Sequence, residues 1–198
     1  MTHMEELTEL LHQRGMIRPR DAAKLGIAPE YFQRLSAAGR IERVSRGLYR
    51  LVEAPLSEHH DLALVAARVP HGTICLLSAL AFHRLGTQLP FEVWLAVGRN
   101  AGVPRLEFPH IRLMRFSADT FTTGVETHLI EGVQVKVFSP AKTVADCFKF
   151  RNQIGLDVAL EALREYRRGR RGTLDELWRM AQVCRVANLM RPYLEAIE

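Results

Sequence analysis

The fold of the N-terminal part is decided by the stretch Gly39–Val52, which reads GRIERVSRGLYRLV. It contains four arginines and one opposing glutamate: Arg40, Arg43, Arg46, Arg50 and Glu42. A helix here would hold Ile41, Val44 and Gly47 in its interior, and all three are mediocre or poor helix formers. The pattern therefore favours two short strands, 41–44 and 48–52, around a turn at 45–47. Gly47 supplies the positive φ that such a turn needs.

Two helices are expected near the start of the chain. In residues 4–13 the leucines recur at helical spacing, and Gly15 is a suitable C-cap. A shorter helix is expected within residues 16–27, with Ala22, Ala23 and Leu25 on its apolar side. Gly26 is expected to close it.

A third helix is expected to begin at Pro29, because a proline at the first helical position needs no N–H and already has a helical φ. It turns Phe32 and Leu35 inward and stops at Gly39. Three short helices followed by a hairpin is the element order of a winged helix-turn-helix. We therefore predict such a DNA-binding domain over residues 1–54.

The third helix and the hairpin carry the side chains expected to contact DNA. Arginine and glutamine on a recognition helix can make paired hydrogen bonds to guanine and adenine, and a wing arginine can reach phosphates or the minor groove. The candidates on the helix are Tyr31, Gln33 and Arg34, and those on and before the hairpin are Arg40, Arg43, Arg46 and Arg50. The alternative is an ordinary solvated helix face and a charged hairpin that keeps the chain soluble.

Residues 55–198 are expected to form a mixed α/β domain after the boundary at Pro55. The predicted helices cover 57–69, 73–86, 140–150, 155–169, 173–184 and 189–197, and the predicted strands cover 91–98, 111–117, 125–130 and 133–139. Glu131-Gly132 is a tight hairpin signal. Ser139 and Thr173 are predicted N-caps, and Thr173 begins a capping box with Glu176. The whole chain is thus predicted to be α+β, with a small sheet and C-terminal helices in its second domain.

A second basic cluster follows the predicted helix 155–169. It is dense for its length: Arg164, Arg167, Arg168, Arg170 and Arg171. Cations near a helix C-terminus interact favourably with the helix dipole, which accounts for one or two of them. The others indicate either a second nucleic-acid contact or an acidic protein partner, and a solvated surface is the equal alternative.

Composition and motifs give little sign of catalysis. The chain has 198 residues, a net charge of +5 and three widely spaced cysteines, which we expect to be buried thiols in a reducing cytoplasm. Its eight histidines form no zinc-binding pattern, and neither a phosphate-binding loop nor a serine-nucleophile motif occurs. We therefore predict a cytoplasmic protein that is not an enzyme and needs no cofactor or metal. A signal peptide and a membrane span are not expected either.

The sequence RDAAKLGIAPEYFQRLSAAGRIERVSRGLYRL, residues 20–51, resembles the winged-helix domain of AbiE-type antitoxins, which belong to abortive-infection type IV toxin–antitoxin systems. The resemblance continues through GTICLLSALAFHRLG, FEVWLAV, VKVFSPAKTVADCFKFRNQIGLDVALEAL and RVANLMRPYLEA, and so covers nearly the whole chain. The SPAKTVADCFKFR segment is the most specific part.

The resemblance implies a protein that represses its own operon by binding promoter inverted repeats in double-stranded DNA. It also implies a C-terminal domain that neutralises a nucleotidyltransferase-like toxin without a stable direct complex. We expect the protein to be a monomer or a weak dimer, and the sequence leaves this choice open. No defined site carries over to that domain, although Lys142, Thr143 and Asp146 stand in its specific block, and Asp146 can be a structural ion-pair partner. The alternative function is a stand-alone winged-helix regulator whose second domain senses a ligand.

Overall fold

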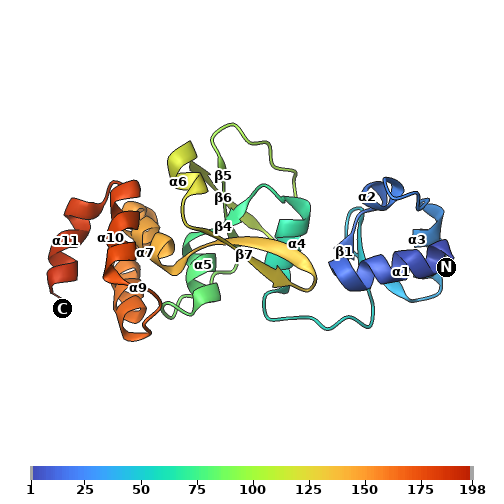
Figure 1. Ribbon diagram of the computed structural model, residues 1–198, viewed down its shortest axis with the longest axis horizontal. Helices are drawn as coiled ribbons and strands as arrows, with labels where there is room; N and C mark the ends of the chain where they lie inside the picture. Colours follow the sequence, from blue (N-terminus) through green and yellow to red (C-terminus); the bar gives the residue numbers. More distant parts are fainter. Residues whose placement is uncertain (1, 197–198) are drawn as a thin grey trace. The chain divides into compact units, whose positions relative to one another are not determined.

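The computed structural model describes residues 2–196, and its fold is α+β, as predicted (Figure 1). The chain divides into two compact units. The first runs from the N-terminus to Pro70 and includes His128–Val135, and the second comprises His71–Thr127 and the chain from Lys136 onward. The functional boundary between residues 54 and 55 stays a prediction.

The N-terminal module contains three helices and a small sheet. The helices are α1 (His3–Arg14), α2 (Pro19–Ala23) and α3 (Glu30–Ala37), and the strands are β1 (Met16–Ile17), β2 (Ile41–Ser45) and β3 (Leu48–Leu51). Thr2 and Glu5 form a capping box at the start of α1. Leu7 and Leu11 from α1 pack with Phe32 and Leu35 from α3 in one apolar core. This is the arrangement of helices and hairpin that the sequence predicts.

The sheet of this module has the order β1-β3-β2, so β3 is its central strand. The sequence predicts only the hairpin of β2 and β3, and the strand β1 is not predicted. Two residues are too few to show an alternating pattern, and the pairing of Met16 with Arg50 is long-range. The consequence is that β3 has a neighbour on both sides.

The predicted apolar side of the second helix is confirmed for Ala22, which is 0% exposed, and wrong for Ala23 and Leu25. The helix α2 ends at Ala23, and Leu25 lies beyond it with 51% of its surface exposed. Gly26 has a φ of 83°, and Ile27 N donates to Ala22 O across the turn. This left-handed turn places Ile27, rather than Ala23 or Leu25, in the core, where Ile27 is 1% exposed.

The rest of the chain begins with α4 (His60–Arg68) and contains a mixed five-stranded sheet in the order β6-β5-β4-β8-β7. Its strands are β4 (Thr73–Ile74), β5 (Val93–Gly98), β6 (Ile111–Phe116), β7 (Val125–Ile130) and β8 (Val133–Phe138). β5 runs parallel to β6 and antiparallel to β4, whereas β4 runs parallel to β8. The helices between the strands are α5 (Leu76–His83) and α6 (Ala118–Thr122).

One local prediction in this region is wrong and another is confirmed. The predicted helix 73–86 is split, because Thr73 and Ile74 form β4 and the helix α5 starts only at Leu76. An apolar run of this kind does not distinguish a buried strand from a buried helix. The turn at Glu131 and Gly132 is as predicted, and φ values of 50° and 75° at these residues suit a tight hairpin.

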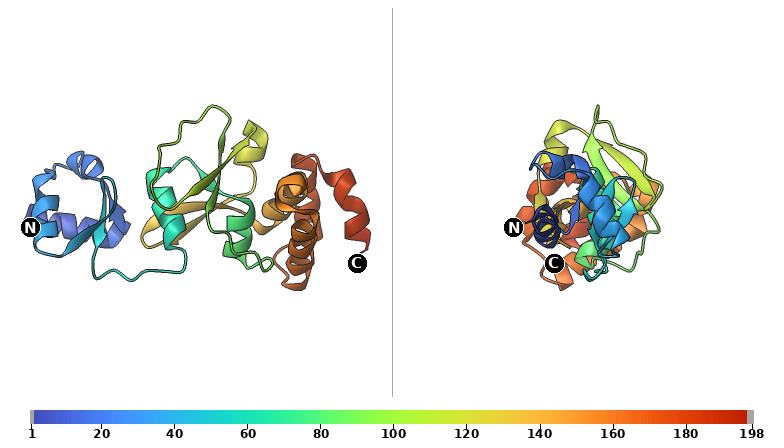
Figure 2. Two further views of the ribbon diagram at one scale, coloured as in Figure 1. Left: turned by 180° about the vertical axis from the view of Figure 1, so that it is seen from behind. Right: turned by 90° about the vertical axis from the view of Figure 1, so that its right-hand side faces the viewer.

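The C-terminal helices pack together in the second unit (Figures 1 and 2). They are α7 (Pro140–Lys149), α8 (Arg151–Ile154), α9 (Leu156–Arg168), α10 (Leu174–Val183) and α11 (Ala187–Glu195). Both predicted caps are present: Ser139 accepts from Lys142 N, and Thr173 forms a capping box with Glu176. The last helix is predicted over residues 189–197, and residue 197 lies outside the described residues.

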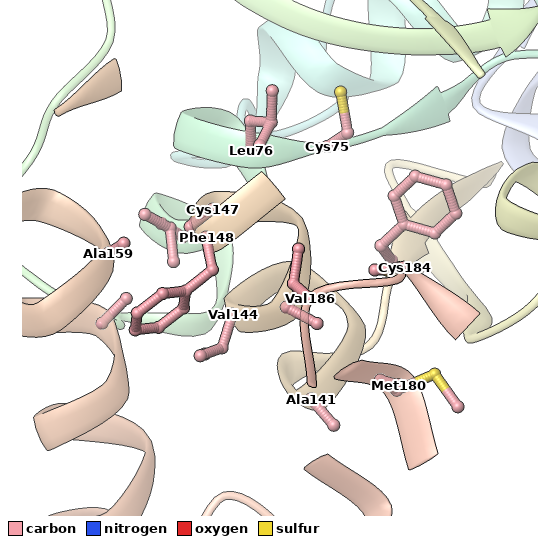
Figure 3. Packing of buried hydrophobic residues seen from close by; sticks show 14 of the residues in the cluster. Cys75, Leu76, Ala141, Val144, Cys147, Phe148, Ala159, Met180, Cys184 and Val186 are labelled. Carbon is pink, nitrogen blue, oxygen red and sulfur yellow. The ribbon is translucent and has the colours of Figure 1, made fainter. Parts of the chain in front are cut away.

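The helix α7 is the centre of the large core (Figure 3). Helical spacing in residues 140–150 predicts that Val144, Cys147 and Phe148 face inward, and all three are fully buried. Helical spacing in residues 155–169 predicts that Leu156 faces inward. This is wrong, because Leu156 begins α9 and is 37% exposed. All three cysteines are buried and free, in agreement with the sequence.

Candidate nucleic-acid interface

The helix α3 separates its side chains as a recognition helix requires. Phe32 and Leu35 are 2% and 0% exposed and attach the helix to the core. Gln33 and Arg34 are exposed on the other side, and Tyr31 is half-buried between the two faces. A recognition helix must keep one face on its domain while the other reaches base edges. The predicted helix residues are therefore brought together on one accessible surface.

Arg34 is held only loosely. Its guanidinium carbon lies 5.5 Å from the centre of the Tyr31 ring, and Arg34 Nη2 is 3.9 Å from Glu30 Oε1. The side chains of this ion pair are 61% and 58% exposed, and such surface pairs contribute little. Arg34 could therefore leave Glu30 and bind a base edge with little loss of free energy.

Three of the four arginines predicted on and before the hairpin are exposed. Arg46 is exposed at the turn beside Gly47, whose φ is 65°. Arg43 is exposed on β2 and donates from Nε to Ser45 O at 3.3 Å. Arg40 is exposed after Gly39, and its N–H donates to Leu35 O to close α3. Within residues 2–196, no acidic side chain forms an ion pair with these three arginines.

Arg50 does not belong to this display. It is 5% exposed, and its Nε donates to Glu42 Oε1 at 2.6 Å while Nη1 donates to Ala54 O at 3.1 Å. Arg50 lies on the central strand β3, with β1 beside it. Its guanidinium therefore joins β2 to the chain after β3, and we remove Arg50 from the proposed DNA contacts.

Arg68 also belongs to this region, and the sequence did not predict its role. From the end of α4, it donates a hydrogen bond from Nη1 to Arg46 O at the hairpin turn. The link is long-range, and no local pattern announces it. Arg68 thus supports the turn that presents Arg46.

The second basic cluster is exposed in full, as Arg164, Arg167, Arg168, Arg170 and Arg171 all lie at the surface. Arg168 Nη1 is 3.6 Å from Glu165 Oε1. The cluster follows the C-terminal end of α9, and Arg170 has a left-handed φ of 49° just after Gly169. The chain therefore turns within the cluster, and its arginines do not share one helix face.

A buried polar group occupies α7, within the SPAKTVADCFKFR segment. Lys142 and Asp146 are both 0% exposed and form an ion pair, and Cys184 Sγ donates to Asp146 Oδ1 at 3.2 Å. Lys142 Nζ also lies 4.1 Å from the centre of the Phe138 ring. Asp146 is thus the structural ion-pair partner that the sequence suggested, whereas the contact from Cys184 was not foreseen.

The buried environment raises the pKa of the Asp146 carboxyl group and of the nearby thiols. Burial raises the pKa of Asp146, while Lys142 and the hydrogen bond from Cys184 act in the opposite direction. Burial, reinforced by Asp146, raises the pKa of Cys184 to about 12 and that of Cys75 and Cys147 well above the ordinary value. Thiols of this kind are weak nucleophiles.

Residues 5–52 match the family model described as "Transcriptional regulator, AbiEi antitoxin". The matched segment includes α3 and the hairpin, and the resemblance that the sequence predicts is confirmed for it. AbiEi antitoxins are transcriptional regulators, so the match supports an antitoxin or regulator role. No curated protein matches the chain.

The fold also resembles a solved structure, the crystal structure of the Rv2827c protein from Mycobacterium tuberculosis. The TM-score is 0.58 at 12% sequence identity, over 92% of this chain and 72% of the other. At this identity the likeness concerns the fold alone. Among residues 2–196, no helix has the length and apolarity to cross a membrane, and no group of three or more acidic, histidine or cysteine side chains is placed to hold a metal ion.

Proposed function

We propose that this protein is the antitoxin and autorepressor of a type IV toxin–antitoxin system. The N-terminal module binds promoter inverted repeats in double-stranded DNA. The remaining chain neutralises a nucleotidyltransferase-like toxin without a stable complex, as a cytoplasmic monomer or weak dimer that is not an enzyme. One observation supports the DNA-binding part. Within the segment that matches AbiEi regulators, an exposed helix face and the hairpin region present Arg34, Arg40, Arg43 and Arg46. Among the described residues, the only acidic partner of these four is Glu30, which pairs with Arg34.

The proposed contacts divide by role. Gln33 and Arg34 on α3 read base edges, and Tyr31 contacts a phosphate or a thymine methyl group. Arg46 at the turn reaches a phosphate or the minor groove, where the planar guanidinium is well suited, and Arg43 and Arg40 assist it. Positioning by phosphates and reading of bases are separate contributions to binding.

This division predicts two different defects. Arg34→Ala is expected to lose about 1–3 kcal/mol of preference for the promoter over unrelated DNA. Arg46→Ala is expected to weaken binding to all sequences and to reduce the slope of log K against log salt by about one unit. Gel shifts with promoter and scrambled duplexes across a salt series measure both.

Arg50→Lys is a useful third variant, because Arg50 is buried and outside the proposed contacts. It tests whether a defect comes from the hairpin's stability rather than from contact with DNA, provided that its unfolding midpoint is measured alongside. Unchanged binding in both Arg34→Ala and Arg46→Ala would contradict the proposed interface.

A second candidate function is a stand-alone regulator whose second domain senses a ligand. The observation that favours it is a cavity in the second unit, lined by parts of α7, α9 and α10. A neighbouring gene for a nucleotidyltransferase-like protein that is toxic alone and harmless with this protein would decide for the antitoxin.

A further inference from the structure

The cavity in the second unit has a volume of about 550 Å³. It lies where the start of β7 meets α7, α9 and α10, helices that pack together in Figures 1 and 2. Cavities of about 300–1,000 Å³ are the usual size for small-molecule sites. The cavity is far along the chain from the hairpin and α3, and none of the proposed DNA contacts lines it.

Two arginines line this cavity and have unused donors. Arg171 follows α9, and Arg179 lies on α10. Within residues 2–196, neither guanidinium takes part in an ion pair or side-chain hydrogen bond. Nearby arginines do have partners: Arg168 pairs with Glu165, and Arg191 lies 5.6 Å from the centre of the Trp178 ring. The two arginines at the cavity are therefore available to a ligand.

Two carboxylates also line the cavity, but both are engaged. Glu176 Oε2 accepts the Thr173 N–H at 3.0 Å as part of the capping box of α10. Glu126, on β7, also has an interaction partner. Both carboxylates keep their charge, but they already have hydrogen-bond or other partners, whereas the guanidinium N–H groups of Arg171 and Arg179 have none among the described residues. The two guanidinium groups are therefore the donors left to bind a ligand.

The walls of the cavity are fixed by hydrogen bonds and close packing. Tyr166 donates from its hydroxyl to Thr173 O at 2.9 Å, and Ser139 N donates to Gly124 O at 2.7 Å. Gly124 has a φ of 71°, and a Cβ there would lie 2.7 Å from Lys142 Cβ, so the chain passes α7 too closely for another residue. Walls held in this way lose little freedom when a ligand binds.

We propose that this cavity binds a small organic anion. The anionic group, a phosphate or a carboxylate, is held between Arg171 and Arg179, since the guanidinium fork suits both groups. The body of the ligand packs against the apolar lining residues Val125, Met180 and Val183. The start of α7, at Pro140 and Ala141, also lines the cavity, and its dipole adds to the attraction for an anion.

The experiment is isothermal titration of the full-length protein with four probes: inorganic phosphate, citrate, adenosine 5′-monophosphate and adenosine. We expect saturable binding of at least one anion and at least tenfold weaker binding of adenosine. Phosphate-bearing probes that bind more tightly than citrate identify a phosphate site, and the reverse order identifies a carboxylate site. Each of Arg171→Ala and Arg179→Ala is expected to weaken the binding anion by about tenfold.

The matched control is the double variant Arg164→Ala/Arg168→Ala. It removes the same charge as Arg171→Ala/Arg179→Ala from the exposed side of α9, and neither residue lines the cavity. Anion binding should survive in the control and disappear in the cavity variant. Equal losses of anion binding in the two variants would overturn the proposal. So would the absence of saturable anion binding by the unaltered protein at probe concentrations up to about 10 mM, which covers even weak specific binding. The DNA-binding proposal is tested with other residues and stands or falls separately.

Discussion

At the scale of single residues, burial decides which charges are available to a partner. Arg46 and Arg50 lie four positions apart on one hairpin, yet Arg46 is exposed and Arg50 is 5% exposed and paired with Glu42. Lys142 and Asp146 are an extreme case, because both are buried completely. A buried ion pair is costly to form and more costly to break, since removal of one member leaves the other charge without a partner in a dry site.

This cost gives a direct prediction for Lys142→Met. After this substitution, the Cys184 thiol is the remaining side-chain donor to Asp146. The free energy of unfolding should fall by about 3–5 kcal/mol. Urea unfolding followed by circular dichroism measures the loss. The double variant Lys142→Met/Asp146→Leu removes both charges and should recover most of it. A single variant as stable as the unaltered protein would show that the pair is not structural.

At the scale of elements, the turn between β7 and β8 holds the segment that leads into α4. Glu131 accepts hydrogen bonds from Ser57 N at 2.7 Å and from Ser57 Oγ at 3.0 Å, and its Oε2 lies 2.7 Å from His60 Nδ1. The Glu131 side chain is 9% exposed. Burial acts to raise the pKa of Glu131, but the hydrogen bonds from Ser57 and His60 outweigh it and lower the pKa below 4.5.

The sign of this shift predicts how Glu131→Gln alters the dependence of stability on pH. A carboxyl group whose pKa is lower in the folded chain stabilises the fold above the unfolded value near 4.5, and this contribution fades as pH falls through the folded pKa. The variant should therefore unfold at lower urea than the unaltered protein at pH 7, and the gap should close below about pH 4.5. Urea midpoints between pH 3 and 8 measure this.

Ser57→Ala is the matched control for that experiment. It removes the hydroxyl donor and leaves the Ser57 N–H and His60 in place, so a smaller gap with the same direction is expected. A constant difference between Glu131→Gln and the unaltered protein over the whole pH range would mean that the carboxylate is not the group responsible.

At the scale of the whole molecule, the chain divides its proposed tasks between two parts. The segment that matches AbiEi regulators ends at residue 52, whereas the cavity and the buried Lys142–Asp146 pair belong to the second unit. The core that attaches α3 and the core around α7 are made of different residues. Surface changes in one part should therefore leave the stability and the task of the other unaffected.

A double variant of the full chain tests this division. Arg34→Ala/Arg46→Ala is expected to abolish repression of a promoter reporter and still to protect cells from the toxin. Arg99→Ala/Arg105→Ala removes the same charge from the loop before β6 and should preserve both activities. Toxin protection that disappears together with repression would contradict separate tasks for the two parts.

The sequence alone determined the features that depend on neighbours along the chain. The hairpin at 45–47, the caps at Ser139 and Thr173 and the turn at Glu131-Gly132 all follow from the backbone and hydrogen-bonding preferences of a few adjacent residues. The tertiary structure decided what depends on distant segments. Arg50 is buried on a strand that pairs on its far side with residues 16–17. Ile27 rather than Leu25 enters the core, and the cavity arises where four separated elements meet. Such pairings join residues far apart in sequence, and local propensity carries no record of them.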